Sequence, residues 1–205
     1  MSKLPQFSTG GTVARATWVV VACILAIGFF RVLRATLLPE LPNFSPLMAV
    51  AFCGGLFLPG LVAWLLPLAV LVVSDMALSA ALGFPVFSWG QAGAWFATLV
   101  VVALGRWVSS RGRFGVGTFA GSLVVGSVFF YLATNSLSWL VEPSYPRSLE
   151  GWWMALTVGL PGFPPTWTFF RNSVASDLLF GGAVLAAWAA ASLPAKSPVP
   201  LRAEA

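Results

Sequence analysis

Polar and charged side chains interrupt the apolar last third of the chain. Residues 167–180 read Trp-Thr-Phe-Phe-Arg-Asn-Ser-Val-Ala-Ser-Asp-Leu-Leu-Phe and begin an apolar run that continues to Leu193. In hydrocarbon, each charged or amide group is costly unless another polar group meets it. On a helix, Ser173 and Asp177 lie one turn apart on one face, whereas Arg171 points about 120° away from Asp177. Both charges are therefore expected to find partners on other segments, and the stretch is a candidate binding site.

Other segments carry polar groups that could complete such a site. Amides, carboxylates and a guanidinium among aromatic rings are typical of a pocket for a small organic molecule. The predicted ligand-binding residues are Asn43, Asp75, Trp89, Asn135, Trp139, Arg171, Asn172 and Asp177. Asp75 and Arg171 are expected to pair with each other or through a ligand. The plainer alternative is a structural network in which these groups satisfy one another and hold no ligand.

The composition argues against several kinds of chemistry. The chain has no histidine, which removes the commonest general base and metal ligand. Its two cysteines, Cys23 and Cys53, fall in apolar segments and form no metal-binding motif. No Walker A pattern is present, so any use of ATP requires a partner. We expect no metal, no cofactor and no enzymatic activity; a weaker alternative is a membrane enzyme that uses Asp75 and Asp177 as a carboxylate pair.

The overall composition predicts a multi-pass membrane protein. Of its 205 residues, 59% are hydrophobic and 8% are charged, and the mean hydropathy is +0.90. A soluble domain has about 25% charged residues. The net charge of +5 arises largely from short loops, where basic residues report membrane orientation, so nucleic acid is not an expected partner. The expected location is the inner membrane of a bacterium, with lipid as the surrounding partner.

The hydropathy pattern predicts an all-α membrane domain over residues 16–193, with cytoplasmic tails at 1–15 and 194–205. Six spans are expected, at 16–33, 45–59, 61–82, 91–108, 116–141 and 167–193. The second is shorter than the ~20 residues needed to cross upright, so it is expected to pack inside the bundle, aided by Gly54 and Gly55. Residues 151–166 predict a short re-entrant or interfacial helix that acts as a lid.

The distribution of basic residues predicts the orientation. With both termini in the cytoplasm, seven lie inside and three outside. The inner ones are Lys3, Arg15, Arg106, Arg111, Arg113, Lys196 and Arg202; the outer ones are Arg31, Arg34 and Arg147. The strong polar groups within the spans then all fall in the outer half, together with many aromatic residues, some of which are expected to be interfacial belt residues.

Two resemblances follow from particular residues. Ala22-x-x-x-Ala26 in the first span, the segment Pro-Asn-Phe-Ser-Pro at 42–46 and the pairs Gly54-Gly55 and Pro59-Gly60 resemble the substrate-binding S-components of energy-coupling-factor transporters. This resemblance implies an outward pocket for a vitamin or other micronutrient, and it implies that Ala22 and Ala26 contact a transmembrane coupling subunit served by separate ATPases. No signature in the chain names a vitamin.

The second resemblance is to an uncharacterised family of small bacterial membrane proteins. It rests on the short motifs 43–46, Ser74-Asp75, Thr134-Asn135, 145–147 and 170–172 with Asp177. This family implies no function. Two alternatives therefore stay open: Ala22 and Ala26 serve ordinary packing inside the fold, and the chain is a structural accessory subunit of a larger membrane complex.

Overall fold

The computed structural model describes residues 10–37, 43–83, 85 and 87–194, and every regular element in these ranges is a helix. The helices are α1 (Gly10–Leu37), α2 (Leu47–Phe57), α3 (Val62–Leu82), α4 (Trp89–Ser110), α5 (Val116–Val141), α6 (Leu149–Leu156) and α7 (Thr166–Ala191). Five of them, α1, α3, α4, α5 and α7, are long and apolar enough to cross a membrane. The chain is a multi-pass, all-helical membrane protein.

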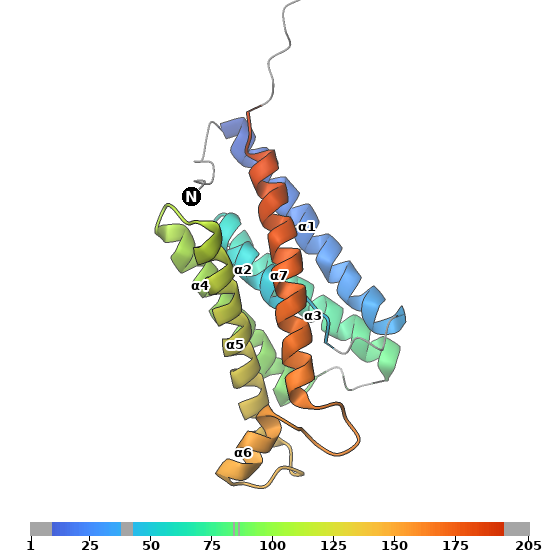
Figure 1. The fold of residues 1–205 in the computed structure, drawn as a ribbon. Coiled ribbons are helices and arrows are strands. Elements are labelled where there is room, and N and C mark those ends of the chain that lie inside the picture. The colour runs from blue at the N-terminus through green and yellow to red at the C-terminus, as the bar shows by residue number, and fades with distance from the viewer. Residues whose placement is uncertain (1–9, 38–42, 84, 86, 195–205) are drawn as a thin grey trace, which may run out of the picture.

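Apart from the short α6, successive helices alternate in direction, so the bundle has two distinct ends (Figure 1). The start of α1 and the end of α7 lie together at one end, which we call the terminal end. Arg15 joins them there: its Nε donates to the Ala191 carbonyl at 2.8 Å, and its Nη2 donates to the Leu193 carbonyl. At the opposite end, which we call the pocket end, α1, α3 and α5 finish and α2, α4 and α7 begin.

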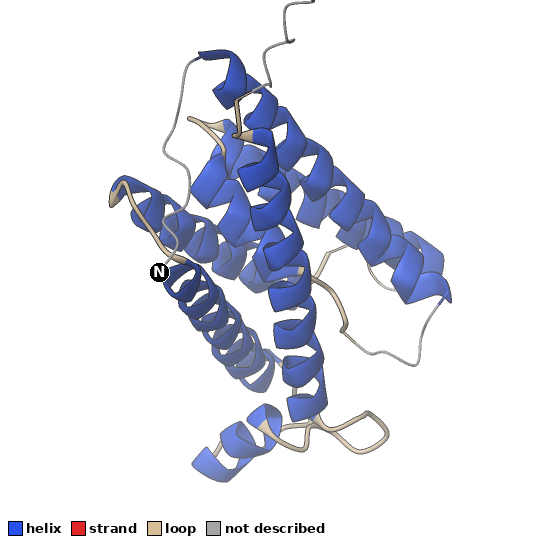
Figure 2. Ribbon diagram, turned by 45° about the horizontal axis from the view of Figure 1, so that its top comes forward, coloured by secondary structure: helices blue, strands red, loops and turns tan. Residues whose placement is uncertain are grey.

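The second predicted span is a short buried helix. At 11 residues α2 is about 16 Å long, roughly half the thickness of a bilayer core. Ten of its residues are buried, and Figure 2 shows the longer helices around it. The prediction that it packs inside the bundle is confirmed. The first helix, by contrast, is longer than predicted, because α1 begins at Gly10 within the segment expected to be a tail.

Glycines let α2 and α4 approach until their backbones touch. A Cβ atom on Gly55 would lie 2.2 Å from the Val102 carbonyl oxygen, and one on Gly105 would lie 2.3 Å from the Phe52 carbonyl oxygen. Arg106 then donates from Nη1 to the Leu58 carbonyl at 3.2 Å, just beyond the last turn of α2. The predicted role of the glycine pair in close packing is confirmed.

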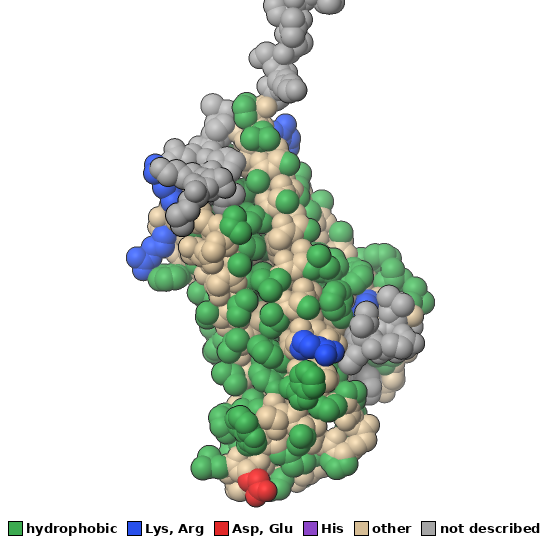
Figure 3. Space-filling view, in the orientation of Figure 1, with side chains coloured by type: hydrophobic (Ala, Val, Ile, Leu, Met, Phe, Trp, Pro, Cys, Tyr) green, Lys and Arg blue, Asp and Glu red, His purple; other side chains and the backbone are tan. Residues whose placement is uncertain are grey.

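Apolar side chains are spread over the whole visible surface, and basic groups lie near the terminal end and also in the half nearer the pocket end (Figure 3). On α1, Val20 and Ile24 face the core, whereas Ala22 and Ala26 lie on the exposed face. The exposed fractions of Trp18 and Phe29, on the same helix, are 71% and 69%. Ala22 and Ala26 therefore do not pack inside the chain's own fold, and α1 presents them outward among large apolar side chains.

Candidate functional site

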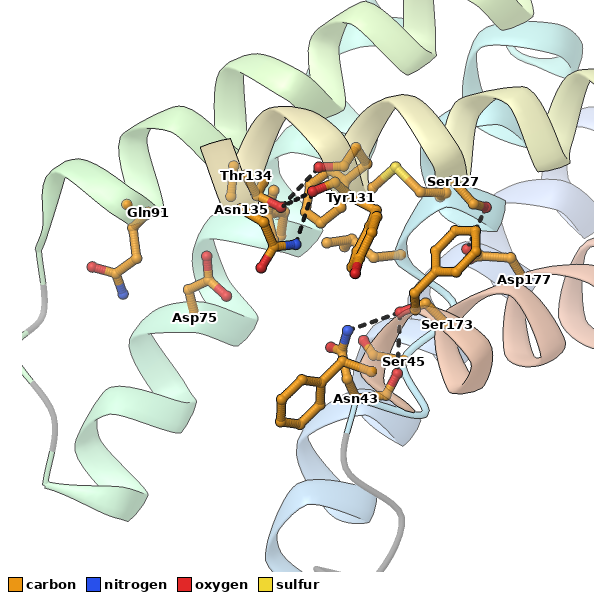
Figure 4. A pocket seen from close by; sticks show the side chains of 18 of the residues that line it. Asn43, Ser45, Asp75, Gln91, Ser127, Tyr131, Thr134, Asn135, Ser173 and Asp177 are labelled. Atoms are coloured by element: carbon orange, nitrogen blue, oxygen red, sulfur yellow. Dashed lines mark hydrogen bonds between the residues drawn. The ribbon is translucent and has the colours of Figure 1, made fainter. Parts of the chain in front are cut away.

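A cavity of about 440 Å³ lies at the pocket end, and six segments contribute to its wall. Its polar lining residues come from the end of α1, the segment just before α2, the second half of α3, the start of α4, the middle and second half of α5 and the first half of α7. They are Arg31, Asn43, Ser45, Asp75, Ser88, Gln91, Ser127, Tyr131, Thr134, Asn135, Thr166, Ser173 and Asp177. Figure 4 shows ten of these around one space.

Arg31 and Asp75 form the ion pair of the cavity, joining α1 to α3. Arg31 Nη2 lies 2.6 Å from Asp75 Oδ1, and the two side chains are only 16% and 11% exposed. Arg31 also donates from Nε to Ser45 Oγ at 3.2 Å and from Nη1 to Ser74 Oγ. The second carboxylate oxygen of Asp75 accepts the Trp95 indole N–H at 2.8 Å. This network fixes the end of α1 against α3 and α4.

The expected pairing of Asp75 with Arg171 is wrong. Arg171 is exposed and does not line the cavity. Its guanidinium lies over the Trp167 ring, with Cζ 5.3 Å from the ring centre, and its Nε and Nη2 each donate to Asn172 Oδ1 at 3.3 Å. A position 120° away from Asp177 turns Arg171 to the outer face of α7. These contacts lie on its own helix, so the expectation that Arg171 finds its partner on another segment is also wrong.

Asp177 is the N-terminal cap of α2, supplied from α7. Its Oδ1 accepts the Ala49 backbone N–H at 2.9 Å and its Oδ2 accepts the Ser127 hydroxyl at 2.8 Å. Pro46, at the N-cap position itself, makes no side-chain cap hydrogen bond. A carboxylate at a helix N-terminus satisfies orphan N–H groups and complements the helix dipole. Asp177 is 1% exposed, and its main structural role is to cap α2 and hold this buried helix against α7.

Asn43 and Ser173 join the start of α2 to α7 at the edge of the cavity. Asn43 Nδ2 donates to Ser173 Oγ at 2.8 Å, and Ser173 Oγ lies 3.3 Å from the Asn43 carbonyl. Asn43 has φ of 54°, in the left-handed region that asparagine tolerates better than most residues.

Two amide side chains, Gln91 and Asn135, face the cavity from α4 and α5. Asn135 Nδ2 donates to the Tyr131 carbonyl at 2.8 Å, one turn back on α5. Gln91 Nε2 lies 3.5 Å from Ser79 Oγ. The Gln91 Oε1 atom is buried and has no hydrogen-bond partner among the described residues.

Half of the predicted ligand-binding residues line the cavity and half lie elsewhere. Asn43, Asp75, Asn135 and Asp177 line it, whereas Trp89, Trp139, Arg171 and Asn172 do not. Trp89 is 72% exposed. Trp139 donates its indole N–H to the Pro146 carbonyl at 2.8 Å, outside the cavity. Two aromatic residues of the stretch 167–180, Phe169 and Phe170, contribute to the wall.

The short helix expected to be a lid is α6, and it contributes no residue to the cavity wall. It packs on the end of α5, where Trp152 donates its indole N–H to Ser136 Oγ at 2.8 Å and Tyr131 donates its hydroxyl to the Leu156 carbonyl. In the preceding loop, Ser144 donates its hydroxyl (2.8 Å) and its backbone N–H (3.1 Å) to Glu142 Oε1, which lowers the pKa of that carboxyl. Helix α6 therefore packs against α5 and supports it beside the site.

Several lining residues escaped the sequence analysis as site residues, among them Gln91, Ser127 and Tyr131. A signal for the last two was present, because Ser127, Tyr131 and Asn135 recur at four-residue spacing and so share one face of α5. Gln91 carried no such signal: it stands alone at the start of an apolar helix, and only the packing of α4 against α3 brings it to Asp75.

The site is suited to hydrogen bonding and apolar contact with an organic molecule. Phe130, Phe169 and Phe170 add aromatic surface, and the Tyr131 and Phe170 rings pack with centroids 4.7 Å apart. No three His, Cys, Asp or Glu side chains gather closely enough to hold a metal ion within the described ranges. Polar groups converging on an aromatic cavity are the usual design of small-molecule pockets.

Comparison with known proteins places the chain in a family. Searches of curated proteins and of solved structures find no match. The resemblance to energy-coupling-factor S-components is thus without support from these comparisons, whereas the resemblance to an uncharacterised family agrees with the family found. A protein-family model does match the chain, over residues 12–199, which include every described helix from α2 to α7 and nearly all of α1. The chain belongs to a family of unknown function, DUF6580.

Proposed function

We propose that the protein is a solute-binding component of a membrane uptake system, which takes a small molecule into the pocket-end cavity. The observation that carries the proposal is the cavity itself, whose volume of about 440 Å³ and mixed lining fall within the range of small-molecule sites. Six separate segments place polar groups on its wall. A vitamin-like or other micronutrient is a ligand of suitable size.

The proposed topology has six passes, with α2 as the short second pass and both termini in the cytoplasm of a bacterial inner membrane. Its support is that the start of α1 and the end of α7 lie at the same end of the bundle, with basic residues near them. In this orientation the pocket end faces outward, where a nutrient is captured.

The proposed partner surface is the exposed face of α1. Ala22 and Ala26 stand outward, four residues apart, beside Trp18 and Leu25. Small residues at this spacing allow another transmembrane helix to approach closely. A coupling subunit with separate ATPases would dock here, as the S-component resemblance implies.

A second candidate is a structural accessory subunit of a larger membrane complex. The observation that favours it is that both buried carboxylates already have hydrogen-bond partners within the protein. Asp75 accepts hydrogen bonds from Arg31 and Trp95, and Asp177 accepts them from the first turn of α2 and from Ser127. Such networks hold helices together without any ligand.

We propose no catalytic activity. The two carboxylates considered for a membrane enzyme, Asp75 and Asp177, have different hydrogen-bond partners on different helices. An arrangement in which two carboxyl groups share a proton requires them to be in direct contact.

Native mass spectrometry of the gently purified protein separates the two candidates. A small molecule retained by the single chain is the result expected of a solute-binding component. A stable complex with another membrane protein that carries no small molecule would favour the accessory subunit and contradict the proposal.

A further inference from the structure

The charges of the described residues are divided unequally between the two ends of the bundle. In the half at the pocket end, four arginines stand against four carboxylates, namely Arg31, Arg34, Arg147 and Arg171 against Asp75, Glu142, Glu150 and Asp177. The half at the terminal end has four arginines and, among its described residues, no Asp or Glu. They are Arg15, Arg106, Arg111 and Arg113. The terminal end is therefore positive, and the acidic side chains visible in Figure 3 lie at the opposite end.

Two of these arginines already hold helices together. Arg15 donates to carbonyl groups at the end of α7, and Arg106 donates to the Leu58 carbonyl just after α2. A carbonyl group accepts a hydrogen bond, but it does not neutralise the charge of a guanidinium. Both arginines therefore add to a positive field over the terminal end, and such a field attracts anions.

Arg111 is held at the surface by Trp107, one turn earlier on α4. Its guanidinium Cζ lies 4.6 Å from the centre of the Trp107 ring, and both side chains are exposed. Trp107 is in the last turn of a helix long enough to cross a membrane, and tryptophan rings are enriched where a membrane meets water. Stacking uses the flat face of the guanidinium, so the N–H groups at its edge can bind an acceptor at this depth.

The turn that follows brings a second exposed arginine beside the first. Gly112 has φ of 74°, in the left-handed region that glycine adopts easily, and Arg113 comes directly after it. We call residues 111–113 the basic turn. Helix α5 then begins at Val116, and no side chain caps its N-terminus. The positive end of the α5 dipole therefore adds to the charge of the two arginines.

The depth of the basic turn identifies the anion that it meets. The two helices that it joins are both long and apolar enough to cross a membrane. Val116 and Trp107 are 56% and 53% exposed, so apolar surface begins directly beside the arginines. An acceptor bound here is bordered by hydrocarbon on one side. Lipid phosphates lie at this depth, and a planar guanidinium binds phosphate through two parallel N–H groups.

We propose that the basic turn binds the headgroup phosphate of an anionic phospholipid in the leaflet at the terminal end. Arg111 and Arg113 contact the phosphate, and the acyl chains lie on the apolar surface around Trp107 and Val116. A headgroup with net negative charge is favoured over a zwitterionic one, because the same arginines repel the cationic group of a zwitterion. This site is separate from the pocket-end cavity and independent of the ligand proposed there.

Three probes test the site: dioleoyl phosphatidylglycerol, dioleoyl phosphatidylcholine and inorganic phosphate. The two lipids share their acyl chains and a phosphate group and differ in net charge, and inorganic phosphate distinguishes a lipid headgroup from a free anion. Each probe is added to the full-length chain in a neutral detergent, and binding is read from the unfolding midpoint and by native mass spectrometry. We expect phosphatidylglycerol to be retained and to stabilise the protein, phosphatidylcholine to do so far less, and inorganic phosphate to have no effect.

Variants of the two arginines locate the site. Arg111→Gln and Arg113→Gln should each weaken phosphatidylglycerol binding about fivefold, and the double variant about twentyfold, because each basic residue at a membrane surface adds a similar attraction to anionic lipid. Both side chains are exposed, so folding should be unaffected. The matched control is Arg171→Gln, which removes an exposed arginine that also lies over a tryptophan ring, but at the end where the charges balance. Its affinity for phosphatidylglycerol should equal that of the unaltered protein.

Four outcomes of these measurements would overturn the inference: equal retention of phosphatidylcholine, an equal effect of inorganic phosphate, an unchanged affinity in the double variant, or the same loss in Arg171→Gln as in Arg111→Gln. Added salt should weaken phosphatidylglycerol binding to the unaltered protein more than to the double variant, because salt screens exposed charges. Equal weakening would also contradict the inference. None of these results bears on the proposed function, because retention of a small molecule in the cavity is measured without added lipid.

Discussion

At the scale of single residues, the charges of this chain have separate tasks. Arg31 and Asp75 hold α1 to α3 across the cavity wall, Asp177 caps α2, and Arg171 lies outside on Trp167. Polar residues in a membrane domain are expected to be functional. Here Asp75 and Asp177 hold helices together and also line the cavity at the pocket end.

A double-mutant cycle tests the ion pair. Asp75→Asn and Arg31→Gln should each lower the free energy of unfolding in mild detergent by about 3 kcal/mol, because each leaves a largely buried charge without its partner. The double variant should recover much of that loss, since the coupling belongs to the pair.

Arg171→Gln serves as the comparison in this cycle and should change stability by less than about 0.5 kcal/mol, as expected for an exposed side chain. If Asp75→Asn coupled to Arg171→Gln instead of to Arg31→Gln, the assignment of the pair would be wrong.

At the scale of elements, α2 determines how the bundle closes. It is too short to cross the bilayer upright and is apolar on all sides, so it is stable only where neighbours surround it and cap its ends. Asp177 and Arg106 supply these contacts at its two ends, and Gly55 and Gly105 bring α4 into backbone contact. The polar wall beside its first turn depends on this placement.

Glycine substitutions separate backbone contact from helix propensity. Gly105→Ala should destabilise the protein by about 1–3 kcal/mol, because the new methyl group would meet the backbone of α2, which cannot move aside without repacking. Gly121→Ala on α5, where a Cβ atom meets nothing within 4 Å, is the control. That change should stabilise the helix by about 0.5–1 kcal/mol. Equal effects of the two substitutions on the unfolding midpoint would rule out the close α2–α4 contact.

At the scale of the whole molecule, the sequence predicts the fold better than it predicts the contacts. Hydropathy and the glycine and proline residues between apolar runs locate the helices, and α5 covers the predicted residues, 116–141. The gathering of polar groups at one end also follows from the sequence, because alternating helix directions fix which halves meet. The partner of Asp75 does not follow, because Arg31 and Arg171 occur in the same half of the bundle and only the lateral order of helices distinguishes them. For the same reason, the sequence does not predict whether the face of α1 that carries Ala22 and Ala26 packs inside the bundle or points outward.

The orientation in the membrane predicts a labelling pattern. A single cysteine at Ser110, at the terminal end, should be protected from an impermeant thiol reagent in intact cells, and one at Ser144, at the pocket end, should react. Both side chains are exposed, whereas Cys53 is buried and Cys23 is half-buried, and the unaltered protein gives the background. The opposite pattern would place the pocket on the cytoplasmic side and contradict an uptake role.

The claim that the pocket-end cavity holds a small molecule is tested most directly by filling it. Ala94 lines the cavity from α4, and Ala103 lies exposed on the same helix, so Ala94→Phe and Ala103→Phe add the same side chain inside and outside the site. The measurement is mass spectrometry of small molecules released when each purified, folded protein is denatured. We expect a molecule from the unaltered protein and from Ala103→Phe that is largely lost from folded Ala94→Phe. Equal retention by both variants, or no released molecule from the unaltered protein, would contradict the claim.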